Sequence, residues 1–236
     1  MTYNSTLPKV FVYLLTSIEA IYQTSVPLEV QNRKNVHLAT SDCLVITCYL
    51  WGVLHFSETL KAMHQLAQSL FPNFLEYARF VRRCNALLPS IQVIRQALVF
   101  KEVEGIDVSI IDSFPIPLCQ PIRNFRSKVL GDMGYLGQSL HDRLELKGID
   151  LMTPVRKNMK QKKILFPNFS KRRKVIERVF SFLTNLGAER CKSRSPQGFQ
   201  LKLEMILLAY SLLLKSAKSL EPETLRYSIG YQVMAK

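Results

Sequence analysis

One segment of the chain, residues 43–56, is apolar at nearly every position, and this feature constrains the fold more than any other. A helix that is apolar on all sides has no face for solvent, so it must lie at the centre of a core. Ser41 and Asp42 stand just before the segment and are suitable helix-capping residues. Trp51, the only tryptophan, is therefore predicted to be a core residue rather than a platform for a ligand.

Further helices are predicted on both sides of this segment. They cover residues 8–22, 57–71, 74–88 and 90–100. In the helix after Ser57 the apolar residues recur at helical spacing, and Pro72 and Pro89 interrupt the helical pattern. Residues 1–100 are therefore predicted to form an all-α region.

Beyond Gly105 the pattern changes and alternates between strands and helices. Strands are predicted over residues 106–111, 128–130 and 149–155. Helices are predicted over residues 135–146 and 171–183, and a last helix over 195–215. This alternation predicts an α/β domain with a partly parallel sheet.

The positive charge of the chain is concentrated in its second part. The net charge is +14; residues 1–100 carry 8 Lys and Arg against 5 Asp and Glu, whereas residues 101–236 carry 24 against 13. A balance this basic indicates a polyanionic partner, most simply a nucleic acid. The alternative is a solvated basic face without a partner.

The cysteines and histidines form no metal-binding or disulfide pattern. The 5 cysteines are odd in number and scattered, without a C-x-x-C pair, and the 4 histidines are scattered too. This usage predicts a reducing, cytoplasmic environment, and neither a zinc site nor a disulfide framework. The late apolar run at residues 205–214 is too short to span a bilayer, and no signal-peptide pattern frames residues 10–15.

Three acidic residues stand where an α/β fold gathers its ligands. Asp112 ends the first predicted strand, Asp132 follows the second, and Glu177 lies on the 171–183 helix behind four consecutive cations. Carboxylates at the ends of neighbouring parallel strands face the crevice where ligands bind, and their oxygens suit Mg²⁺. Two ordinary alternatives stay open, because Asp is common in turns and Glu177 stands one helical turn after Arg173, a suitable ion-pair partner.

Several short sequence words occur around these acids in a fixed order. They are Asp-Ser-Phe-Pro-Ile-Pro at 112–117, Gly-Asp-Met-Gly-Tyr-Leu at 131–136, Thr-Pro-Val-Arg-Lys-Asn-Met-Lys at 153–160 and Lys-Arg-Arg-Lys-Val-Ile-Glu-Arg-Val-Phe-Ser at 171–181. Phe-Pro-Asn-Phe at 71–74 and Leu-Leu-Ala-Tyr at 207–210 belong to the same series. Together these words resemble a signature of the DDE transposases of bacterial insertion sequences, over roughly residues 15–215.

The resemblance implies a domain organisation. It implies a ribonuclease-H-like catalytic domain over residues 101–215, preceded by a helical region over residues 1–100 that binds DNA ends. Residues 216–236 form a tail without an assigned role. Because two element ends must be brought together, a homodimer is favoured.

The resemblance also implies the chemistry of the site. Asp112, Asp132 and Glu177 match the family's catalytic acids, which bind two Mg²⁺ or Mn²⁺ ions for hydrolysis of the phosphodiester and for strand transfer. Contacts with DNA are implied for a set of basic and amide side chains, namely Arg156, Lys157, Asn158, Lys160, Lys171, Arg172 and Arg173.

The interval between Asp112 and Asp132 departs from the family pattern. It holds 19 residues, whereas the two strands, the helix and the turns that the family places there need on the order of 35 to 40. The domain is therefore expected to be incomplete through an internal deletion. The alternative function is then an inactive remnant that only binds DNA. The 44 residues between Asp132 and Glu177 are enough for the elements expected there.

Overall fold

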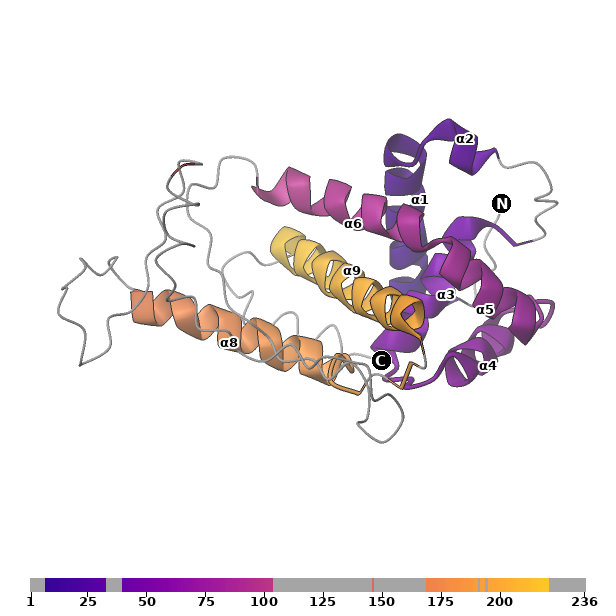
Figure 1. Cartoon of the computed structure of the whole chain (residues 1–236). Coiled ribbons are helices and arrows are strands. Elements are labelled where there is room, and N and C mark those ends of the chain that lie inside the picture. The colour runs from indigo at the N-terminus through magenta and orange to yellow at the C-terminus, as the bar shows by residue number, and fades with distance from the viewer. Residues whose placement is uncertain are drawn as a thin grey trace.

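The computed structural model describes residues 7–32, 40–103, 146, 169–190, 192–193 and 195–220. All the regular elements of these residues are helices (Figure 1). The N-terminal helices are α1 Lys9–Ser25, α2 Leu28–Gln31, α3 Asp42–Leu54, α4 Leu60–Leu70, α5 Tyr77–Ala86 and α6 Leu88–Val103. The C-terminal helices are α8 Phe169–Asn185 and α9 Pro196–Leu220.

Helix α3 lies at the centre of the core. Eleven of its 13 residues are buried, and it packs on α1, α4, α5 and α9. The Ser41 Oγ accepts a hydrogen bond of 3.1 Å from the backbone N–H of Leu44, which caps the first turn. The prediction of a helix buried on all sides is confirmed, and so is the core position of Trp51, which is 8% exposed.

Helices α3 and α4 approach closely at Gly52. A Cβ atom on Gly52 would lie 2.8 Å from the Cβ and 3.3 Å from the Cα of Met63. Met63 is itself 1% exposed, so it has no free space into which to move. Glycine at this position therefore sets the distance between the two helices.

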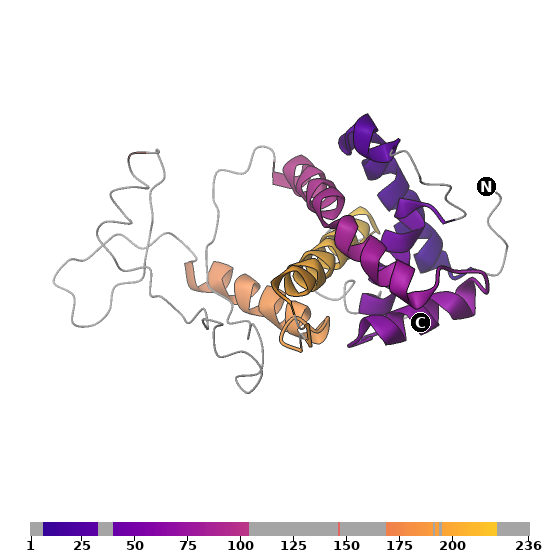
Figure 2. The same cartoon turned by 45° about the vertical axis from the view of Figure 1, so that its right-hand side comes forward.

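Helix α9 belongs to the same core as the N-terminal helices. It packs against α3, α5, α6 and α8, and Figures 1 and 2 show it between α6 and α8. Six of its apolar side chains are at most 1% exposed: Leu201, Met205, Ile206, Leu208, Ala209 and Leu212. Full burial of a Leu or Ile side chain contributes about 1.5–3 kcal/mol, so α9 is a main stabilising element. Within the described segments, α9 included, no helix has the length and apolar character needed to cross a bilayer.

Two ion pairs with little exposure tie these helices together. The Arg95 Nε on α6 donates to the Glu204 Oε2 on α9 at 2.5 Å. Arg83 on α5 donates twice to the Asp42 Oδ1 on α3, at 2.7 and 2.9 Å, and the Tyr22 hydroxyl donates to the Asp42 Oδ2 at 2.9 Å. The Arg83 side chain is only 15% exposed, because Asp42 holds it against the core.

The predicted α/β, ribonuclease-H-like fold is contradicted. No strand occurs anywhere in the ranges that the structure describes, and α8 and α9 bury their apolar faces among helices. The prediction failed because an apolar helix face fits a sheet and another helix equally well, and local periodicity does not distinguish them. The segments predicted as strands, 106–111, 128–130 and 149–155, lie outside the described residues. The division of the chain at residues 100 and 215 stays a prediction.

Candidate functional site

Helix α8 carries the described part of the candidate site. The sequence predicted a helix over residues 171–183, and α8 confirms it at Phe169–Asn185. Its inner face packs on α9, where Leu183 is 6% exposed and the ring centroids of Phe182 and Tyr210 lie 6.2 Å apart. Figures 1 and 2 show that the N-terminal end of α8 points away from the group formed by α1 to α5. One end of the helix is thus anchored, and the other extends from the core.

The C-terminal end of α8 is closed by a Schellman motif. The backbone N–H of Ala188 donates to the Leu183 oxygen and that of Gly187 to the Thr184 oxygen, both at 2.9 Å. Gly187 has a φ of +91°, which a residue with a Cβ adopts only with strain. Leu186 and Ala188 are buried beside the motif. The local sequence therefore fixes where α8 ends and how the chain turns toward α9.

Glu177 lies on the solvent face of α8. Its side chain is exposed, and so are those of Arg178, Ser181 and Asn185 on the following turns. A carboxylate in this position is hydrated and accessible to a large partner without any rearrangement of the core. The alternative interaction of Glu177, an ion pair with Arg173, stays a prediction because the Arg173 side chain lies outside what the structure describes.

The other predicted site residues are placed only in part. Lys171, Arg172 and Arg173 lie near the N-terminal end of α8, where the structure describes the helical backbone. The remaining predicted residues lie outside the described residues, and they are Asp112, Asp132, Arg156, Lys157, Asn158 and Lys160. The assignment of the three acids to one site stays a prediction.

The donor chemistry of the predicted metal site suits a hard cation. Asp112, Asp132 and Glu177 offer only carboxylate oxygens, which Mg²⁺ and Mn²⁺ accept. Of the three, Glu177 is described, and its side chain is exposed. In the part of the chain with described positions, no group of three His, Cys, Asp or Glu side chains is arranged to hold a metal ion.

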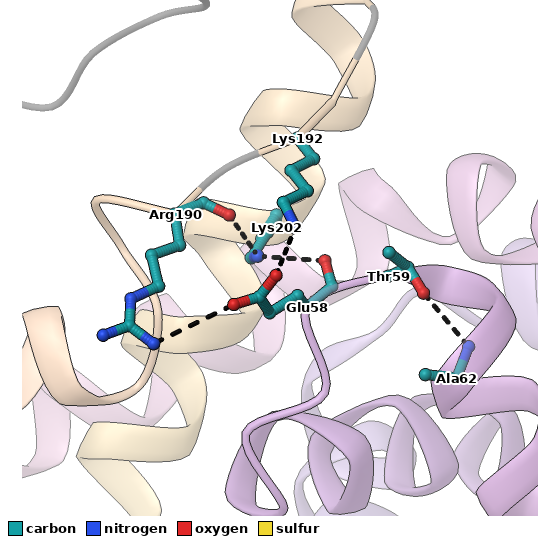
Figure 3. A network of polar contacts seen from close by, with 6 residues as sticks. All are labelled: Glu58, Thr59, Ala62, Arg190, Lys192 and Lys202. Atoms are coloured by element: carbon teal, nitrogen blue, oxygen red, sulfur yellow. Dashed lines mark hydrogen bonds and ion pairs between the residues drawn. The ribbon is translucent and has the colours of Figure 1, made fainter.

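A second charged cluster, which sequence analysis missed, lies where the turn before α4 meets the turn between α8 and α9 (Figure 3). We call it the Glu58 patch: Glu58, Arg190, Lys192 and Lys202. Lys192 donates to the Glu58 carboxylate, and the Arg190 Nη1 lies 3.9 Å from its other oxygen. The Lys202 Nζ donates to two backbone oxygens, of Arg190 at 3.1 Å and of Glu58 at 3.4 Å. The hydrogen bond from Lys192 holds the pKa of Glu58 below its usual value. No sequence signal joins residues 134 positions apart.

The described cysteines are buried free thiols, at Cys43, Cys48 and Cys84. Burial raises the pKa of the Cys43 thiol to about 12 and also raises the pKa values of Cys48 and Cys84. Since the thiolate is the form that binds metal and attacks electrophiles, these thiols act as core side chains. Cys119 and Cys191 lie outside the described residues.

Comparison with known families supports the resemblance at the level of one domain. Residues 107–212 match the family model of the transposase DDE domain. The matched range contains Asp112, Asp132 and Glu177, and it ends within α9. No curated protein and no solved structure matches the chain.

Proposed function

We propose that this protein is a DDE transposase of an insertion sequence, acting on DNA with the help of a divalent metal ion. The observation that carries the proposal is the match of residues 107–212 to the transposase DDE domain, because that range includes all three acids. The basic charge of residues 101–236 supports a DNA partner independently of the match, since 24 Lys and Arg stand against 13 acids there.

The proposed roles follow from the chemistry of the side chains. Asp112, Asp132 and Glu177 hold the divalent ions; when bound, the metal activates the attacking oxygen and stabilises the leaving oxygen of the phosphodiester. Glu177 reaches the DNA from the exposed face of α8. The basic residues of segments 156–160 and 171–173 neutralise backbone phosphates and thereby orient the strand.

The packing of α8 supports this assignment. Its C-terminal half packs on α9, where the ring centroids of Phe182 and Tyr210 lie 6.2 Å apart, and Leu183 is 6% exposed. A rigid helix that is anchored at one end holds an exposed carboxylate in a defined place, and a metal site needs that pre-organisation.

A plasmid-nicking assay tests the proposal. Supercoiled DNA that carries the element ends is incubated with the protein and Mg²⁺ or Mn²⁺. We expect nicking by the wild type and its loss in Asp132→Asn and Glu177→Gln. Glu76→Gln is the matched control, because Glu76 is an exposed acid at the start of α5 without a capping bond, and it should nick like the wild type.

The same assay distinguishes the inactive remnant. The inactive remnant is considered because the interval from Asp112 to Asp132 holds only 19 residues. Such a remnant would bind DNA in the presence of EDTA and would not nick it. DNA affinity that does not change between about 50 and 200 mM salt would contradict both functions, since several phosphate contacts cost roughly a thousandfold over that range.

A further inference from the structure

The Glu58 patch holds more positive charge than its acid can balance. Arg190 and Lys192 both contact the single carboxylate of Glu58, and the Lys202 ammonium lies beside it and donates to the backbone oxygens of Glu58 and Arg190 (Figure 3). Glu189 is the neighbouring acid in the sequence, and its carboxylate accepts a hydrogen bond from the Thr184 hydroxyl at 3.1 Å. Among the described side chains of this turn and the patch, with Glu189 included, three cations accompany two acids. The patch is therefore a local centre of positive potential.

The two outer cations of the patch are accessible. The Arg190 and Lys192 side chains are 72% and 64% exposed, whereas that of Glu58 is 39% exposed. The Lys202 residue is only 6% exposed and holds the backbone of the turn from behind. Arg190 and Lys192 are thus presented to solvent on a turn whose position is already fixed, which lowers the entropy cost of binding a partner.

The patch follows the C-terminal end of α8, beyond the turn at Gly187. The solvent face of α8 carries the exposed side chains of Glu177 and Arg178 in the middle of the helix. Helix α8 has 17 residues, so it spans about 25 Å at 1.5 Å per residue. That length corresponds to about seven base pairs of duplex DNA at 3.4 Å each.

We propose that Arg190 and Lys192 bind backbone phosphates of a DNA duplex that runs along the solvent face of α8. This inference rests on the proposed function and adds a contact outside the residues predicted from sequence. A duplex fits better than a small anion, because the exposed cations stand apart, with Arg178 in the middle of α8 and Arg190 and Lys192 beyond its end. The Glu58 carboxylate competes with phosphate for the same N–H donors and is displaced when DNA binds.

A purely structural explanation predicts something different. Cations close to the C-terminal end of a helix stabilise it through the helix dipole, and Arg190 follows α8 by five residues. In that case removal of Arg190 and Lys192 lowers stability but leaves the salt dependence of DNA binding unchanged.

The salt dependence of DNA affinity tests the proposal. The double variant Arg190→Gln/Lys192→Gln is compared with Lys9→Gln/Lys215→Gln, which removes the same charge from exposed positions on α1 and α9. For two lost phosphate contacts, the slope of log K against log salt should become shallower by about 1.8. The control pair should keep the slope of the wild type.

The outcomes separate this inference from the proposed function. If the wild type nicks DNA but the double variant and the control pair have equal slopes, the contact at the patch is wrong and the transposase assignment stands. If the wild type neither nicks nor binds DNA, the proposed function is wrong, and so is the inference that rests on it. Should the double variant not fold, Glu58→Gln decides: an increase in DNA affinity at low salt supports competition, and an unchanged or lower affinity overturns it.

Discussion

Helix α3 is buried on nearly all sides, whereas helix α8 has one buried and one exposed side. Eleven of the 13 residues of α3 are buried, so nearly every substitution in it alters the core. Helix α8 is buried on one side near its C-terminal end, while Glu177, Arg178 and Ser181 are exposed. The comparison teaches that α3 stabilises the fold, whereas the solvent face of α8 is free to carry charge that the fold does not need.

The largest effect is expected at the centre of α3. Leu50 is 0% exposed, so Leu50→Ala should leave a cavity and lower the free energy of unfolding by about 2–5 kcal/mol. Urea denaturation followed by circular dichroism measures the change. Ser181→Ala on the solvent face of α8 is the counterpart, and its effect should stay within about 0.5 kcal/mol. Equal losses in the two variants would remove the distinction between the helices.

A somewhat smaller effect is expected where α3 meets α4. Gly52→Ala places a methyl group against the buried Met63 and should cost about 1–3 kcal/mol through overpacking. Adding Met63→Ala should recover part of this loss, because it removes the Met63 Cγ and the atoms beyond it, although the Met63 Cβ stays in contact. A double-mutant cycle by denaturation measures the coupling; strictly additive losses would show that the two helices are not in contact there.

The end of α8 should be sensitive to backbone geometry. Gly187→Ala forces a Cβ into a left-handed conformation, at a φ of +91°, and should cost about 1 kcal/mol. Gly187→Asn is the control, since Asn tolerates this conformation better and should lose less. Hydrogen exchange of the α8 amides reports the change locally. Equal exchange in both variants and the wild type would mean that the turn does not hold the helix.

The smallest effect on stability is expected at the candidate site itself. Glu177 is exposed, so Glu177→Gln should change the free energy of unfolding by no more than about 0.5 kcal/mol. Thermal denaturation is the measurement. A large loss of stability would instead show that Glu177 is needed for folding. Any loss of activity in Glu177→Gln would then result from unfolding.

The parts of the fold that were predictable depend on local pattern. A central helix could be identified from the apolar run at residues 43–56 and the capping residues before it. A helix without a polar face is stable only when it is buried in a core. The extent of α8 followed from the helical spacing of its apolar residues, which indicates a helix with one buried face.

The parts that were missed depend on contacts between distant residues. The α/β prediction failed because the apolar face of α9, which begins at Pro196, packs on α3, α5 and α6, the last of which ends at Val103. The pairs Asp42–Arg83 and Glu58–Lys192 join elements whose positions only the tertiary fold determines. An exposed arginine and a paired one have the same local sequence pattern. The sequence therefore gives the number of charged residues but does not show which of them form ion pairs.

The binding of Mn²⁺ to the protein–DNA complex, followed by electron paramagnetic resonance, tests the proposed role of α8 most directly. We predict that Glu177→Gln weakens Mn²⁺ binding by about tenfold or more, because a direct ligand matters at least as much as the outer groups that support one. Glu76→Gln should bind like the wild type. Wild-type Mn²⁺ affinity in a folded Glu177→Gln variant would contradict the role of this carboxylate as a metal ligand.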